Sequence, residues 1–85
     1  MPRIKTVREP KGTKSALKVK RHVASKLLEL RRDHGMTMKE VARKSGISQA
    51  FICQIENAQS APTVVTLVRL SKVFKVPASY WLDGF

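Results

Sequence analysis

The chain has 85 residues, which allow one small domain with a modest hydrophobic core. Its 17 Lys and Arg against 6 Asp and Glu give a net charge of +11, which favours a polyanionic partner, nucleic acid before an anionic membrane. A single cysteine excludes an internal disulfide, and no apolar run is long enough for a membrane span or a signal peptide, so we expect a cytoplasmic protein with no membrane partner.

The first 17 residues are expected to form a flexible basic arm, ahead of one folded domain over residues 18–85. Two prolines, a glycine and few large apolar residues argue against a packed structure near the start of the chain. The arm is either a solvated tail or a segment that contacts DNA phosphates or the minor groove.

A first helix is predicted over residues 18–34. Val23, Leu27 and Leu30 recur there at helical spacing and indicate one apolar face. Gly35 follows the last of these turns and is expected to end the helix.

Two short helices joined by a tight turn are predicted next. Thr37 and Glu40 form a T-x-x-E capping box, which starts the first of them. Gly46 supplies the residue that a left-handed turn needs, and Ser48 is the expected N-cap of the second. The two helices are expected over residues 38–45 and 49–56.

The second of these helices carries two amide side chains, Gln49 and Gln54, among small or apolar residues. A short helix, a turn and an amide-rich second helix are typical of a helix-turn-helix that reads DNA bases. A generic helical hairpin in a small bundle is the alternative interpretation.

Pro62 and Thr63 are expected to open a fourth helix, which Pro77 ends. A short terminal turn follows over residues 78–82. The sequence therefore predicts an all-α fold of five short helices. The apolar face of the fourth helix is expected to comprise Val64, Leu67, Val68, Leu70 and Phe74.

The order and spacing of four segments resemble the Cro/cI-type, or XRE-like, helix-turn-helix repressors. The segments are LxxLRxxHGMT, KEVARKSGIS, ICQIEN and APTVVTLVRLSKVFKVPASYWLDG. This resemblance implies a lambda-repressor-like five-helix bundle with a central helix-turn-helix. It also implies a homodimer that binds operator DNA, with residues 48–56 in the major groove.

The resemblance implies two sets of DNA-contacting residues. Gln49, Ala50, Phe51 and Gln54 would face base edges, where a Gln can pair with adenine and an apolar group with a thymine methyl. For Phe51, a contact with the core is the alternative. Phosphate contacts are expected at the start of the first motif helix, on the surface of that helix, and after the second motif helix. The residues are Thr37, Met38, Lys39, Arg43, Asn57 and Gln59.

The resemblance implies that Arg31 and Glu56 form a partly buried ion pair with a structural role. Their positions agree with this, since each lies beside an apolar stripe, where an unpaired charge would be costly. The chain departs from the family where a Gly usually follows the recognition helix. Asn57 and Ala58 stand there instead, and Asn57 is the residue expected to adopt the left-handed conformation.

A dimer surface is expected at the C-terminal end of the domain, formed by Val65, Trp81 and Phe85. Their apolar side chains are not needed in the expected core, which Leu67, Leu70, Phe74, Tyr80 and Leu82 already fill. Val64 and Tyr80 are the residues of this region for which core packing is expected.

Three classes of function are consistent with the sequence. A sequence-specific repressor of transcription is favoured, with double-stranded DNA and a second copy of the chain as partners. The alternative is an antitoxin of the same fold that neutralises a toxin. An enzyme is disfavoured because the sequence offers no catalytic set of residues. His22 and His34 lack Cys or acidic companions that could complete a metal site. Neither a cofactor nor a small-molecule ligand is expected.

Overall fold

The computed structural model describes the chain from residue 14 to residue 85, with side chains from residue 16 onward. Within that range the fold is all-α and contains no strand, as predicted. Four α-helices are followed by one 3₁₀ helix, so the fifth expected helix is a single tight turn. The elements are α1 Lys14–Asp33, α2 Met38–Ser45, α3 Gln49–Glu56, α4 Val64–Phe74 and η1 Ala78–Leu82.

The first helix begins four residues earlier than predicted. Residues 14–17, which were expected in the arm, belong to α1. Residues 1–13, which hold the rest of the expected arm, lie outside the described range. No helix among the described residues is long and apolar enough to cross a membrane.

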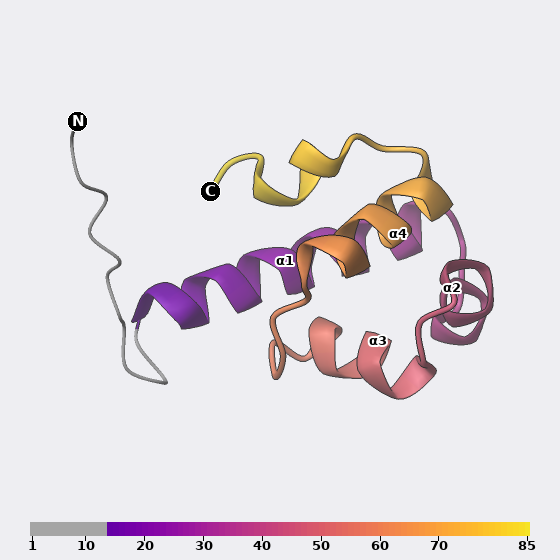
Figure 1. Ribbon diagram of the computed structural model, residues 1–85, viewed down its shortest axis with the longest axis horizontal. Helices are drawn as coiled ribbons and strands as arrows, with labels where there is room; N and C mark the ends of the chain where they lie inside the picture. The colour runs from indigo at the N-terminus through magenta and orange to yellow at the C-terminus, as the bar shows by residue number, and fades with distance from the viewer. Residues whose placement is uncertain (1–13) are drawn as a thin grey trace.

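The helices α2 and α3 lie on one side of α1 and α4, and η1 lies on the other side (Figure 1). On one side, α3 packs against α1 and α2, and α2 also contacts α4. On the other side, η1 contacts both α1 and α4. The recognition helix expected from the sequence, α3, therefore lies across the bundle from the C-terminal turn (Figure 1).

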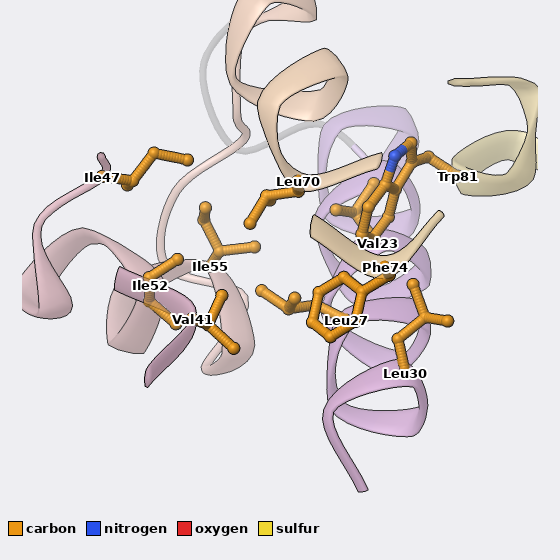
Figure 2. Close-up of a cluster of buried hydrophobic side chains, with 10 residues drawn as sticks. All are labelled: Val23, Leu27, Leu30, Val41, Ile47, Ile52, Ile55, Leu70, Phe74 and Trp81. Atoms are coloured by element: carbon orange, nitrogen blue, oxygen red, sulfur yellow. The ribbon is translucent and has the colours of Figure 1, made fainter. Parts of the chain in front are cut away.

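Every element contributes side chains to a single core, drawn in Figure 2. The predicted apolar face of α1 is confirmed, because its three residues at helical spacing are all buried. Burial of one aliphatic or aromatic side chain of this size contributes about 1.5–3 kcal/mol to folding. The cluster comprises Val23, Leu27, Leu30, Val41, Ile47, Ile52, Ile55, Leu70, Phe74 and Trp81.

Trp81 belongs to this core and not to the surface, so its expected place at a dimer interface is wrong. Its side chain is 0% exposed, and its Nε1 donates a hydrogen bond to Ser71 Oγ at 2.7 Å. Ser71 Oγ in turn donates to the carbonyl oxygen of Leu67 at 2.8 Å. The 3₁₀ turn after Pro77 brings the indole against α1 and α4, and Ser71 supplies the acceptor that a buried indole N–H requires.

Two other expectations for this region are also wrong. Val64 was expected in the core but is 76% exposed, because it is the first residue of α4 and lies outside the buried face. Leu82 was expected in the core but is exposed at the end of η1. Trp81 fills the space instead, and Tyr80 is half-buried with its ring edge-on to the indole.

We expect the variant Ser71→Ala to destabilise the fold by about 1–3 kcal/mol, because it leaves the buried indole N–H of Trp81 without an acceptor. Denaturant unfolding of Ser71→Ala, Trp81→Phe and the double variant measures this effect. In the Trp81→Phe background the serine change should cost much less. Strictly additive free energies would show that the hydrogen bond does not contribute in this way.

Candidate nucleic-acid interface

The start of α2 is held by the capping box that the sequence predicted. Glu40 N–H donates to Thr37 Oγ1 at 3.1 Å, and Thr37 N–H donates to Glu40 Oε1 at 3.1 Å. The hydrogen bond from the Thr37 backbone, followed by the one from its hydroxyl, lowers the pKa of the Glu40 carboxyl below its ordinary value. The carboxylate therefore stays charged at the positive end of the helix dipole.

This cap limits which groups at the start of α2 can reach a phosphate. Thr37 has both its hydroxyl and its N–H engaged with Glu40. The backbone N–H groups of Met38 and Lys39 have no acceptor among the described residues. The side chain of Met38 packs against the core, whereas those of Lys39 and Arg43 are exposed.

The turn between α2 and α3 is fixed by polar bonds and one apolar anchor. Gly46 adopts φ 74° and donates its N–H to the carbonyl of Ala42 at 2.9 Å. Ile47 is buried in the core, and its N–H donates to Ser45 Oγ at 3.2 Å. Ser48 Oγ accepts from the N–H of Phe51 at 3.1 Å and so caps α3, as predicted.

The eight residues of α3 divide into a buried face and an exposed face. Ile52 and Ile55 are fully buried in the core (Figure 2). Gln49, Ala50 and Gln54 are exposed. The opposite face of this short helix therefore presents two amides and one methyl group to the surroundings.

Phe51 takes a different position from these three candidate base readers. Its ring is half-buried and packs against the core, which is the alternative that sequence reasoning left open for it. Cys53, on the same helix, is a free thiol of intermediate exposure.

The chain reverses after α3 through Ala58 and not through Asn57, so the expected left-handed conformation of Asn57 is wrong. Ala58 has φ 57°, whereas Asn57 has φ −92°. Ala58 N–H donates to Ile55 O at 3.1 Å and Gln59 N–H to Gln54 O at 2.9 Å, which is the paired pattern of a Schellman motif.

The side chains of this loop are also engaged. Asn57 Nδ2 donates to the carbonyl oxygen of Cys53 at 3.0 Å and to its Sγ at 3.3 Å, so its donors point back to α3 rather than outward to a phosphate. Gln59 is exposed. Ser60 Oγ donates to Gln54 Oε1 at 3.1 Å, a contact that sequence reasoning missed because no local pattern links residues six apart across a turn.

Arg31 joins three segments at the base of α3. Its Nε donates to Glu56 Oε2 at 2.7 Å and its second terminal nitrogen to Glu56 Oε1 at 3.0 Å. Its remaining terminal nitrogen donates to the carbonyl of Met36 at 3.1 Å. The side chains are only 19% and 5% exposed, and the hydrogen bond to Glu56 raises the pKa of Arg31. The pair therefore ties α3 to α1 and to the loop before α2.

The exposed apolar residues lie mainly on α4 and at the C-terminus. Val65 is 63% exposed and Phe85 60% exposed, and both remain candidates for contact with a second chain. Val64 and Val68, one turn apart on α4, extend the exposed surface around Val65. We call Val64, Val65 and Val68 the α4 valine patch.

Charge is distributed unevenly around the bundle. Glu40 and Glu56 are held in the bonds described above. Glu29, Asp33 and Asp83 lie near Tyr80, where burial first and then these carboxylates raise the pKa of the phenol. Glu29 and Asp33 lie on α1 and Asp83 directly follows η1, so these three acids are grouped around Tyr80. No group of three or more residues that could hold a metal ion occurs in the described part of the chain.

We expect removal of one partner of the Arg31–Glu56 pair to destabilise the fold by about 3 kcal/mol, because the other charge is left poorly solvated. Thermal and denaturant unfolding of Glu56→Gln, Arg31→Met and the double variant form the test. The double variant should lose much less than the sum of the single losses. Additive losses would contradict an energetically coupled pair.

Comparisons with known proteins agree with this architecture. The helix-turn-helix family model HTH_3 matches residues 27–81. The uncharacterized HTH-type transcriptional regulator y4dJ of Sinorhizobium fredii is 39% identical over 54 residues, which are 64% of this chain and 70% of that protein. The HTH-type transcriptional regulator SutR of Escherichia coli is 34% identical over 63 residues, which are 74% of this chain and 35% of that protein.

Solved structures show the same fold. An HTH_3 family transcriptional regulator from Vibrio cholerae superposes with a TM-score of 0.76 at 28% identity, over 80% of this chain and 38% of that one. The restriction-modification controller protein C.AhdI from Aeromonas hydrophila superposes with a TM-score of 0.70 at 19% identity, over 73% of this chain and 94% of that one. The chain thus spans only about a third of SutR and of the Vibrio cholerae protein. With α2 and α3 as its helix-turn-helix, the chain belongs to the HTH_3, or XRE-type, family of DNA-binding transcriptional regulators, which are not enzymes.

Proposed function

We propose that this protein is a repressor that binds a palindromic operator in double-stranded DNA as a homodimer, with α3 in the major groove. One observation carries the proposal: Gln49, Ala50 and Gln54 are exposed on a helix whose opposite face is fixed in the core by Ile52 and Ile55. Such a helix can enter the groove without exposing the core.

The three exposed residues of α3 suit direct readout of bases. The amide of Gln49 carries both donors and an acceptor, and that of Gln54, whose carbonyl accepts from Ser60, carries two N–H donors. Such groups match the polar edges of bases in the major groove. The methyl group of Ala50 suits contact with the methyl group of thymine. Phe51, which packs against the core, is proposed to support this surface from its edge.

Phosphate contacts are proposed at both ends of the motif. The N–H groups of Met38 and Lys39 at the start of α2, together with the Lys39 side chain, offer donors and positive charge. Arg43 on α2 and Gln59 after α3 are exposed and add further donors. The net charge of +11 supports strong attraction to DNA backbone of any sequence.

The α4 valine patch, together with Phe85, is proposed as the contact between two copies of the chain. Exposed valines on one helix are costly in water and are typical of surfaces that another chain covers. A symmetric pair would present two α3 helices, about 34 Å apart, to successive turns of one face of DNA.

We expect base-reading residues and the basic arm to affect binding differently. Gln49→Ala should weaken operator binding by about 1–3 kcal/mol and leave binding to random duplex nearly unchanged. Deletion of residues 1–13 should weaken binding to both duplexes and lower the slope of log affinity against log salt by about 0.9 per lost phosphate contact.

The operator is first selected from a pool of random duplexes. The affinities of each variant for this operator and for a random duplex are then measured at two salt concentrations. If the deletion collapses the operator-to-random ratio while Gln49→Ala preserves it, base readout does not lie on α3.

We expect Val65→Asp to abolish the dimer, because two symmetric copies would each bury an unpaired carboxylate in the interface. The fold itself should tolerate the change, since an acid in the first turn of α4 favours the helix dipole. Sedimentation without DNA measures the dimer fraction. The control Ala50→Asp makes the same charge change on the exposed face of α3 and should leave the dimer fraction unchanged. An unaltered dimer fraction in Val65→Asp would exclude the α4 valine patch as the dimer contact.

A further inference from the structure

The amide of Gln54 is engaged within the protein before any DNA is bound. Ser60 Oγ donates to its side-chain carbonyl, Oε1, at 3.1 Å. Gln59 N–H donates to the main-chain carbonyl of the same residue at 2.9 Å. The loop that follows α3 therefore bonds both carbonyl groups of Gln54.

Ser60 lies in a loop that is fastened on both sides. Ala58, at φ 57°, turns the chain back over the last turn of α3. Pro62 restricts the residue before it to extended conformations, and Thr63 then caps α4 by accepting from Thr66 N–H at 3.2 Å. Ser60 is itself half-buried, and the hydrogen bond from its hydroxyl to Gln54 lies at the exposed surface.

Occupation of Oε1 changes what the Gln54 amide offers to a base. One lone pair of the carbonyl oxygen accepts from Ser60, which turns this oxygen towards the loop, whereas Nε2 keeps two N–H donors and has no acceptor capacity. A two-bond pairing with adenine needs an acceptor and a donor side by side, which match N6 and N7. Guanine presents two acceptors, O6 and N7, to the same groove.

We infer that Ser60 is a positioning residue that turns the Gln54 amide so that its N–H donors face the groove, and that the operator carries guanine rather than adenine at the base read by Gln54. This inference rests on the proposed function, because it assumes that α3 reads bases. With the carbonyl turned away, adenine retains one acceptor for Gln54 and guanine retains two. The second contact corresponds to a preference for guanine of about three- to tenfold.

The test uses the full chain and duplexes that carry each of the four base pairs at every operator position in turn. The position read by Gln54 is the one whose base preference disappears in Gln54→Ala. At that position the unmodified protein should prefer guanine. Ser60→Ala frees the carbonyl and should lower the guanine-to-adenine affinity ratio at least threefold, whereas Ser60→Thr, which keeps a hydroxyl, should preserve it.

Preferences at other positions, affinity for random duplex and the melting temperature control for a general loss of structure. Ser60→Ala should leave the first two unchanged, and in the Gln54→Ala background it should have no effect on any base preference. An unchanged ratio in Ser60→Ala, an adenine preference in the unmodified protein, or a Ser60→Thr protein that behaves like Ser60→Ala would each overturn the inference. If neither Gln54→Ala nor Gln49→Ala alters any base preference, the proposed readout by α3 fails and this inference fails with it.

Discussion

Two aliphatic side chains, Ile52 and Ile55, determine which face of α3 is available for binding. The helix has eight residues and is too short to be stable alone in water, so its formation and its rotation about its own axis depend on packing. Both isoleucines are fully buried among side chains of α1, α2 and α4. Rotation of α3 by one residue would expose an isoleucine and bury an amide, and both changes are costly.

Polar contacts then set where the ends of α3 lie. Ser48 satisfies an N–H group at its start, and Arg31 binds Glu56 at its end. Because Arg31 also binds the carbonyl of Met36, the same guanidinium orients the loop that leads into α2. A buried ion pair of this kind contributes less to net stability than its geometry suggests, and its value here lies in fixing the mutual placement of α1, α2 and α3.

The sequence predicted α2 and α3 well because their ends are marked by local chemistry. Thr37 with Glu40, Gly46 and Ser48 act within a few residues, so each can be recognised without knowledge of the fold. The first turn of α1 is not predicted, because it lies in a basic stretch whose two prolines, glycine and few large apolar residues favour an arm.

The errors arise where partners are distant in the chain. Hydrophobicity alone does not show that Trp81 is buried, since its burial depends on the distant acceptor at Ser71. It also does not show that Val64, the first residue of α4, lies outside the buried face of that helix. The bond from Ser60 to Gln54 was equally invisible, because it exists only once Ala58 has reversed the chain in a conformation that alanine rarely adopts.

The grouping of Glu29, Asp33 and Asp83 near Tyr80 has a consequence for how the molecule meets a duplex. Positive charge predominates in the chain, yet these three acids gather around Tyr80 of η1, and η1 lies across the bundle from α3 (Figure 1). Lys26 Nζ lies 4.5 Å from the centre of the Tyr80 ring and offsets part of this negative charge. In the field of a polyanion the groups around Tyr80 are therefore attracted less strongly than the basic remainder of the chain. This charge distribution favours approach to a duplex with the η1 end turned away, which is the orientation that the proposed binding by α3 requires.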